Sequence, residues 1–395
     1  MIRELKKNIY AVGVQDWDRR LFDELIPLPH GTSYNSYLIK GSNKTALVDS
    51  VDPAKYEELL ANLSEHNIQH LDYIICNHAE QDHSGSIGFL TEKFPQAVVV
   101  TNEKCKGFLM DLLHIPEGRF QVVKDGDTLS LGDKTVEFIL APWVHWPETM
   151  FSYLKEDKIL FSGDFLGSHL ATTDIFACDD TVLEGAKRYY AEIMMPFRPS
   201  IVKHLQKLDT MDIDLIAPTH GPVYKKPFYI VDAYKDWSSE NAKNEVVIPW
   251  VSMHGSTEAM VKHLTEALVK KGIAVKPFNL NKTDIGELAT SLVDAATVIL
   301  ATSTVLVGPH PQGLYAAALV GALRPKTKFL GIIGSYGWGS KAVETIKSLL
   351  TNLKAELLEP VYIKGAPKKE DFEALDKLAE AVAEKHKSLG LLLSV

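Results

Sequence analysis

The six residues from His78 to His83 contain two imidazoles and two carboxylates, all of them typical metal ligands. They follow the apolar run LDYIICN, which predicts a buried strand with these residues on the loop after it. If the loop continues the alternation of the strand, His78, Glu80 and Asp82 point to one side, and a turn brings His83 beside them. A lone histidine is usually an ordinary core or surface residue. Four ligand-type side chains at this spacing favour a metal site.

Three further ligand-type residues follow other apolar runs. His145 comes after VEFILAPWV, Asp164 after KILFSG, and His220 after DLIAPT. Each run predicts a strand, and each residue lies in a loop that begins with small or turn-forming residues. Loops at one edge of a layered fold can bring residues from several strand ends together. The sequence therefore predicts one metal site assembled from these loops.

Two groups of residues near the metal-ligand candidates have plainer explanations. Trp146 and Pro147 either form an apolar wall beside the metals or simply pack in the core. His169, Tyr189 and Tyr190 are more often structural residues, and we do not include them in the predicted site.

A second kind of site is indicated by the segment VSMHGSTEAM, which joins a predicted strand to a predicted helix. It offers hydroxyls and free backbone N–H groups at a helix N-terminus, where a phosphate binds readily. The residues concerned are Ser252, His254, Gly255, Ser256 and Thr257. An ordinary helix cap explains such a segment equally well. The absence of a Gly-Lys-Ser/Thr sequence excludes a nucleoside-triphosphate loop.

Two more loops, ATSTVLVGPHPQG and GSYGWGS, follow the third and fourth strands predicted for the same region. In a doubly wound sheet, ligands bind outside the carboxyl ends of the strands at the switch point. These loops resemble the FMN loops of flavodoxins, with hydroxyls to bond the flavin and an aromatic ring to stack on it. The residues that we expect to contact FMN here are Thr302, Ser303, Thr304, Gly308, Ser335, Tyr336, Gly337, Trp338 and Gly339.

The elements that position these residues differ between the two ends of the chain. Up to about residue 245, strand-like runs occur in hairpins, such as residues 34–50 and 150–165. After that, five strands alternate with five helices, which predicts a doubly wound α/β domain with a parallel sheet of order 2-1-3-4-5. The polar segment 234–245 is the predicted joint. We therefore expect two domains, residues 1–245 and 246–395.

Composition limits the class of protein. The chain has 395 residues, enough for two or three domains at roughly 150 residues each. No apolar run is long enough to span a membrane, and the N-terminus lacks the apolar stretch of a secretory signal. A net charge of −9 disfavours a nucleic-acid partner. Three scattered cysteines, Cys76, Cys105 and Cys178, predict no disulfide framework, and we expect a reducing, cytoplasmic location.

The sequence resembles the metallo-β-lactamase-like fold, an αββα sandwich, and more narrowly the flavodiiron proteins. Hydrolases of this fold use the motif His-x-His-x-Asp-His, which suits zinc. Here Glu80 takes the place of the second histidine, and mixed histidine and carboxylate shells favour iron. The resemblance implies that one iron is bound by His78, Glu80 and His145, the other by Asp82, His83 and His220, and that Asp164 bridges them.

The resemblance also implies an activity, partners and an assembly. A diferrous pair and a reduced FMN supply two electrons each, enough to reduce dioxygen to two waters; the same site can couple two nitric oxides to nitrous oxide. The implied electron donor is rubredoxin or a reduced deazaflavin. The implied assembly is a head-to-tail homodimer or a dimer of dimers. The small number of cysteines leaves no room for a fused rubredoxin module, so we expect the two-domain form.

Two other functions remain open from the sequence. A hydrolase with a zinc pair explains the N-terminal half, but not Glu80, and it gives the C-terminal half no role. An electron-transfer flavoprotein with a metal-free first domain explains the C-terminal half. It predicts that the ligand positions would be lost, whereas all seven are filled here.

Overall fold

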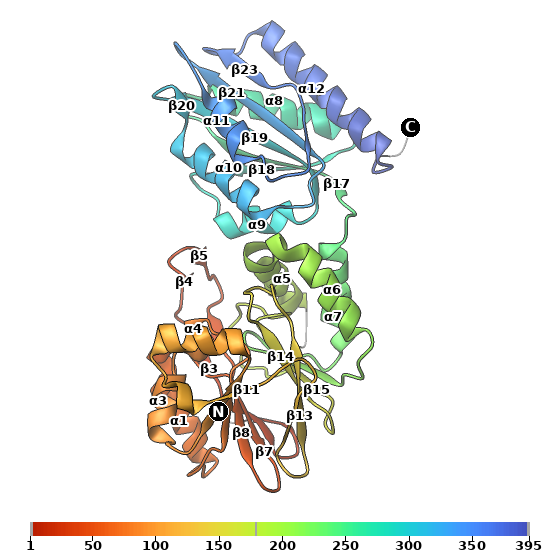
Figure 1. Ribbon diagram of the computed structural model, residues 1–395. Helices are drawn as coiled ribbons and strands as arrows, with labels where there is room; N and C mark the ends of the chain where they lie inside the picture. Colours follow the sequence, from red (N-terminus) through yellow and green to blue (C-terminus); the bar gives the residue numbers. More distant parts are fainter. Residues whose placement is uncertain (1–2, 178–179, 393–395) are drawn as a thin grey trace. The chain divides into compact units, whose positions relative to one another are not determined.

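Two β-sheets lie face to face in the N-terminal part of the chain, and helices cover their outer faces (Figure 1). The computed structural model describes residues 3–177 and 180–392. The first sheet is mixed, with three antiparallel pairings followed by three parallel ones. The second sheet is antiparallel except for its last pair. This arrangement confirms the predicted αββα sandwich.

The strands of both sheets are short. In hydrogen-bonded order, the first sheet contains β1 (Arg3–Lys6), β2 (Ile9–Ala11), β7 (Tyr37–Lys40), β8 (Thr45–Val48), β9 (Tyr73–Ile75), β10 (Val98–Thr101) and β11 (Phe120–Val122). The second contains β12 (Thr128–Ser130), β13 (Thr135–Leu140), β14 (Met150–Leu154), β15 (Ile159–Gly163) and β16 (Leu215–Pro218). Two small ribbons pair β3 (Val14–Asp16) with β6 (Thr32–Tyr34) and β4 (Leu21–Phe22) with β5 (Ile26–Pro27).

The helices of this part lie outside the sheets. They are α1 (Tyr56–Glu65), α2 (Gln81–Ser84), α3 (Ile87–Lys93), α4 (Glu103–Leu113), α5 (Asp180–Tyr189), α6 (Arg198–Leu208) and α7 (Pro227–Ser238). Ile74 and Val99 pack with α1, α3 and α4, whereas their neighbours Ile75 and Val100 face the second sheet. The central strands β9 and β10 are thus mostly buried on both faces, and their sequences, YII and VVVT, are almost wholly apolar.

A single parallel sheet forms the C-terminal part, shown in blue-green and blue in Figure 1. Its strands, in hydrogen-bonded order, are β18 (Ala274–Asn279), β17 (Lys243–Val251), β19 (Ala295–Val305), β21 (Phe329–Tyr336) and, both beside β21, β22 (Glu356–Leu357) and β23 (Val361–Lys364). This confirms the order 2-1-3-4-5. The fifth strand is split at Pro360, which has no N–H to donate to the sheet. A short strand, β20 (Gly308–Pro309), turns back antiparallel to β19.

Helices cover both faces of this sheet, as a doubly wound fold requires. They are α8 (Ser256–Lys270), α9 (Ile285–Leu292), α10 (Pro311–Leu323), α11 (Ala342–Leu349) and α12 (Lys369–Ser388). Helices α8 and α12 share a core with Ile248 and Ile299, while α9 and α10 contact β17 and β19 from the other face. All loops that follow the strands therefore meet at the carboxyl edge of the sheet.

One local prediction was wrong, and the segment predicted as the joint, within which the two units divide after Ser238, has more regular structure than expected. Residues 80–84 do not continue the alternation of the preceding strand, because α2 begins at Gln81. The segment 234–245 is mostly structured, since α7 extends to Ser238 and β17 begins at Lys243. Tyr234 and Trp237 are buried and pack α7 against Phe165 and Tyr190. Their spacing of three residues is the apolar pattern of a helix face. Cys178, one of the three cysteines, lies outside the described residues.

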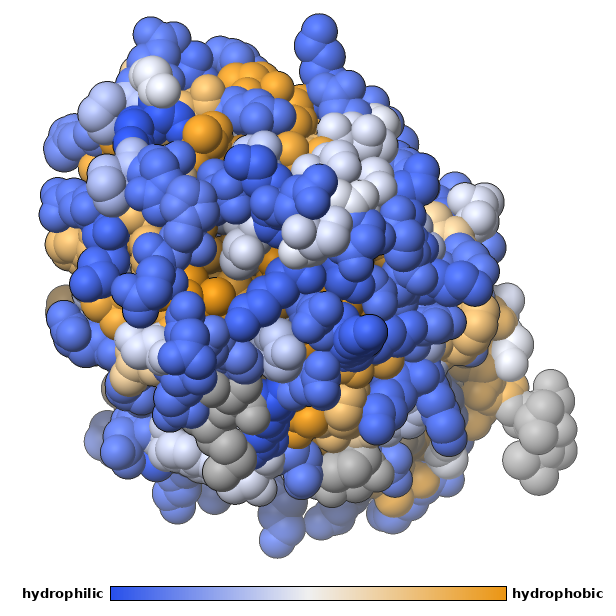
Figure 2. Space-filling model, turned by 90° about the horizontal axis from the view of Figure 1, so that it is seen from below, coloured by the Kyte–Doolittle hydropathy of each residue, from blue (hydrophilic) through white to orange (hydrophobic). Residues whose placement is uncertain are grey.

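The chain forms two units, one of residues 1–190 and 197–238 and the other of residues 239–395 with 191–196. Among the described residues, no helix combines the length and apolar character that crossing a membrane requires. The face drawn in Figure 2 is mostly hydrophilic, with apolar residues scattered between the polar ones.

Candidate metal centre and flavin loops

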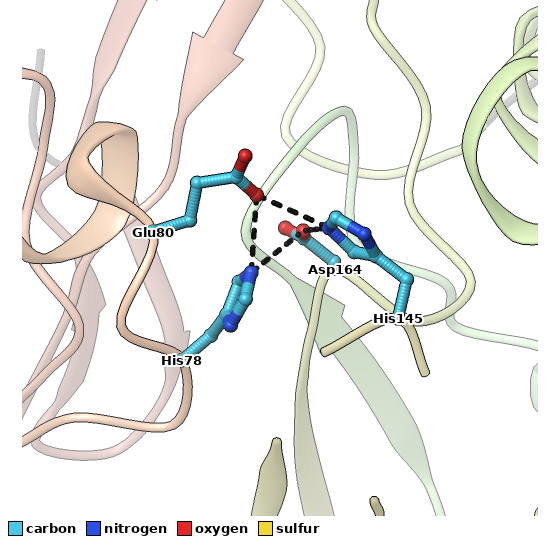
Figure 3. Close-up of side chains that lie close together, drawn as sticks. All are labelled: His78, Glu80, His145 and Asp164. Atoms are coloured by element: carbon cyan, nitrogen blue, oxygen red, sulfur yellow. Dashed lines mark hydrogen bonds and ion pairs between the residues drawn. The ribbon is translucent and has the colours of Figure 1, made fainter. Parts of the chain in front are cut away.

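Four side chains from three loops of the sandwich converge on one point. His78 and Glu80 come from the loop after β9, His145 from the loop after β13, and Asp164 from the end of β15. Figure 3 shows the four side chains pointing toward one another. Glu80 Oε2 lies 3.1 Å from both His78 Nε2 and His145 Nε2. One potential ligand atom of each residue lies within 4.8 Å of those of the other three, which is the spacing needed to surround a single metal ion.

Three more side chains form a second group beside the first. Asp82 and His83 lie on the single turn of α2, and His220 lies on the loop after β16. His220 Nε2 is 3.1 Å from Asp82 Oδ2, and His83 Nε2 is 3.3 Å from Asp82 Oδ1. Successive side chains point about 100° apart on a helical turn but to opposite faces in an extended chain, so the turn brings the directions of Asp82 and His83 closer together. All three side chains are buried.

Asp164 lies between the two groups and turns one oxygen toward each. Its Oδ2 is 3.1 Å from His145 Nε2 and 3.6 Å from His78 Nε2. Its Oδ1 is 2.7 Å from His83 Nε2 and 3.6 Å from His220 Nε2. The hydroxyl of Thr219 donates a hydrogen bond of 2.8 Å to Oδ1 and fixes the carboxylate in this orientation. The geometry is that of a carboxylate able to bridge two metal ions.

The second group has the contacts expected of metal ligands. Both oxygens of Asp82, both ring nitrogens of His83 and Nε2 of His220 are buried, yet none makes a hydrogen bond. Asp82 lies 3.3 Å from His83 Nε2 and 3.1 Å from His220 Nε2 without a hydrogen bond to either, as ligands around one ion do. Leaving so many polar atoms unpaired costs about 1–3 kcal/mol each, and a bound cation would remove that cost. Four histidines and three carboxylates form a donor set that fits iron.

The charges of these groups favour cations. Burial lowers the pKa of His78, but hydrogen bonds to Glu148 and Glu80 raise it, and the net pKa lies well above the usual value. Burial raises the pKa of Glu80, while hydrogen bonds from His145 and His78 lower it more strongly. For Asp164, burial raises the pKa, and the adjacent His83 and His145 hold it well below its usual range. The carboxylates thus stay ionised and attract positive charge into the site.

The outer nitrogens of two ligand histidines have protein partners. His78 Nδ1 donates to Glu148 Oε1 at 2.7 Å, and His220 Nδ1 donates to the backbone oxygen of Ser33 at 2.6 Å. The sequence did not lead us to Glu148, although it comes three residues after His145 in the same loop. Trp146 packs edge-to-face on His78, with ring centres 5.1 Å apart, so it forms part of the wall of the site.

His169 and Tyr189, for which the sequence favours structural roles, both lie against His220. The ring centres are 4.5 Å and 5.9 Å from that of His220. His169 Nε2 and the Tyr189 hydroxyl are buried and have no hydrogen-bond partner among the described residues. Tyr190 points elsewhere and packs on Tyr234 and Trp237. No sequence pattern distinguishes the two adjacent tyrosines. Which of them faces His220 depends on the direction of the backbone at the C-terminal end of α5.

The loops at the carboxyl edge of the C-terminal sheet surround a cavity of about 220 Å³. Eight of the predicted flavin contacts line it, namely Ser252, His254, Ser256, Ser303, Thr304, Ser335, Tyr336 and Gly337. Three lining residues were missed, namely Met253, Gly365 and Ala366. Gly365 and Ala366 belong to the loop after the fifth strand, which meets the other loops at the carboxyl edge of the sheet and was therefore predictable from the topology.

The other predicted contacts do not line this cavity. Gly255 caps α8 with a φ of 85°, and Thr257 is buried with its hydroxyl 3.4 Å from that of Ser335. Thr302 is buried, and its hydroxyl accepts a hydrogen bond from the backbone N–H of His310. The remaining three residues outside the lining are Gly308, Trp338 and Gly339. Trp338 is 79% exposed, so its ring is available to a ligand or a partner rather than packed in the core.

Comparison with known proteins accounts for both halves of the chain. Residues 32–221 match the family model described as ODP family beta lactamase, and residues 248–391 match that of flavodoxin. The nitric oxide reductase of Moorella thermoacetica is 35% identical over 394 residues, which cover 95% of this chain and 96% of that protein. The flavo-diiron protein FprA2 of Clostridium acetobutylicum is 32% identical over 398 residues, covering 96% and 98%.

A solved structure has the same fold over the full length. The rubredoxin:oxygen oxidoreductase of the anaerobe Desulfovibrio gigas matches with a TM-score of 0.94 and 29% identity, covering 98% of this chain and 99% of that one. Relatives and structure thus agree on a metallo-β-lactamase-like domain followed by a flavodoxin-like domain. The chain belongs to the flavodiiron protein family.

Proposed function

We propose that this protein is an oxidoreductase that reduces dioxygen to water, nitric oxide to nitrous oxide, or both, at a pair of iron ions supplied with electrons by FMN. The observation that carries the proposal is the position of Asp164 between two groups of ligand-type side chains. Consumption of each gas by the reduced, iron-loaded protein, followed with an electrode, tests it. If neither gas is consumed, the proposal is wrong.

The ligands follow from the two groups. We assign one iron to His78, Glu80 and His145, the other to Asp82, His83 and His220, and the bridge to Asp164. When bound, the iron pair and FMN supply the electrons, two from each. Burial raises the pKa of Tyr189 well above its usual value, so its hydroxyl keeps its proton and can donate a hydrogen bond beside His220. The Trp146 ring shields His78 and keeps water away from that side.

Glu80 is the residue that we expect to favour iron over zinc. In Glu80→His, the first group exchanges a carboxylate for a third imidazole, which zinc accepts readily and iron favours less. We expect the variant to carry a larger share of zinc and to reduce dioxygen or nitric oxide more slowly. Metal analysis of both proteins from the same growth medium is the measurement. Equal iron content and equal turnover would show that Glu80 does not select the metal.

FMN is assigned to the cavity at the carboxyl edge of the C-terminal sheet. Its phosphate would lie at the N-terminus of α8, where Gly255 leaves open space, and its ring would lie between the loops that carry Ser303 and Tyr336. We propose the domains as residues 1–245 and 246–395. The fragment 246–395 removes Lys243–Glu245 from the start of β17 but keeps the five-strand order and every loop around the cavity.

We therefore expect the fragment 246–395 to fold alone and to bind FMN about as tightly as the whole chain does, because every residue of the cavity is present. Quenching of flavin fluorescence during titration with FMN measures the affinity. A fragment with a cooperative thermal transition that leaves FMN fluorescent would contradict the assignment of the loops.

We further propose that the protein is a cytoplasmic head-to-tail homodimer, or a dimer of such dimers, that receives electrons from rubredoxin or a reduced deazaflavin. Large apolar side chains are exposed around the flavin loops, with Leu306 91%, Trp338 79% and Met253 48% exposed. Exposed apolar residues gathered at one edge are typical of a surface that contacts another protein. A second copy would cover them and bring its own metal groups close to the flavin.

A further inference from the structure

Glu148 is held rigidly beside the first metal group. Its Oε1 accepts a hydrogen bond of 2.7 Å from His78 Nδ1 and another of 3.0 Å from the backbone N–H of Ala79. Its backbone oxygen accepts a hydrogen bond of 2.6 Å from Asn102, which also caps α4. The side chain is fully buried. Glu148 thus connects the loop that carries His145 to the loop that carries His78.

This contact determines which nitrogen of His78 is free for a metal. Because Nδ1 donates its hydrogen to Glu148, the lone pair of the neutral ring is on Nε2. His78 Nε2 faces Glu80 Oε2 at 3.1 Å and the Asp164 carboxylate at 3.6 Å. The contact with Glu148 therefore turns Nε2 of the ring toward the other ligands of the first group, which is the nitrogen that a metal would take.

The second group lacks such a partner. His220 Nδ1 donates to a backbone oxygen, which is uncharged, and His83 Nδ1 has no hydrogen-bond partner among the described residues. A carboxylate on the outer nitrogen orients a ligand histidine and makes it a stronger donor. We infer that Glu148 is a positioning residue that makes the metal position of His78, Glu80 and His145 the tighter of the two, so that it fills first. This inference rests on the proposed metal centre.

Titration of the metal-free full chain with Co²⁺ tests the inference, because the colour of the ion reports its ligands. In the parent we expect two steps, a tight one followed by a weaker one. In Glu148→Gln, which keeps the shape but loses the charge, the tight step should weaken about 10–100-fold, while the other step stays unchanged. Glu148→Asp, which keeps the charge, should recover part of the loss. Glu137→Gln on β13, whose side chain pairs with Lys155 at the surface, is the matched control.

The results of the titration distinguish a failure of the proposed metal centre from a failure of the role assigned to Glu148. A parent that binds no metal contradicts the proposed function itself. A parent that binds two ions, together with a folded Glu148→Gln variant of unchanged affinity, contradicts only the role of Glu148. If Glu148→Gln fails to fold, the parent still decides the question by proton NMR. The inference would be overturned if the Nδ1 proton of His78 exchanged with water as fast as a solvent-exposed imidazole proton does. A proton signal that is protected from exchange supports it.

Discussion

Asp164→Ala is expected to lose metal from both positions, whereas His83→Ala should lose it mainly from one. Each oxygen of Asp164 faces a different group, so its removal takes a ligand from both ions at once and leaves them to repel each other across the gap. Loss of a residue that merely supports a ligand lowers metal affinity about 10–100-fold. Loss of a shared ligand should reach at least the upper end of that range at both positions, with turnover close to background.

The two variants are compared side by side for iron per chain and for turnover. Asp125→Ala, which removes an exposed carboxylate paired with Lys207, serves as the control and should match the parent. Circular dichroism establishes that each variant is folded. Equal and nearly full iron content in Asp164→Ala and His83→Ala would refute the bridging role.

Mixing two inactive variants is expected to restore turnover if electrons cross between subunits. The first variant, His145→Ala, keeps FMN but lacks a complete metal site. The second, Ser256→Glu with Thr257→Val, keeps the metal ligands but places a negative charge where the FMN phosphate would lie. In a head-to-tail dimer, the flavin of the first variant faces the irons of the second. Each mixed dimer has one working site of two, so isolated mixed dimers should show about half of the parent turnover.

Mixed dimers must be isolated with two different affinity tags before turnover is measured. Two copies of the same variant, mixed and tagged in the same way, are the control and should stay inactive. Verified mixed dimers without turnover would refute transfer between subunits. So would a parent that remains fully active at dilutions where light scattering shows only monomers.

Much of the metal centre was predictable because each ligand follows a strand. Apolar runs locate the strands. The residue after such a run lies at an edge of the sheet, however the other elements of the domain pack. This reasoning identified His145, Asp164 and His220 from three separate parts of the chain, and the structure brings them together. It did not identify the turn of α2, because four residues are too few to show a helical period.

Residues that act through another side chain were harder to find. Glu148 lies in a loop, and nothing in its sequence neighbourhood shows that it meets His78, which is 70 positions earlier. His169 and Tyr189 belong to the site because of how α5 and the loop after β15 pack around His220, which is a property of tertiary structure. The FMN loops were predicted from sheet topology. The same topology implied the loop with Gly365 as well.

The most direct test of the account is the metal and flavin content of the purified protein, measured by elemental analysis together with the visible spectrum. The account predicts about two iron ions for each chain, one for each group of ligands, and a yellow flavin spectrum that bleaches on reduction. Zinc in place of iron, with no flavin absorbance even after incubation with FMN, would contradict it and would indicate a hydrolase of the same fold.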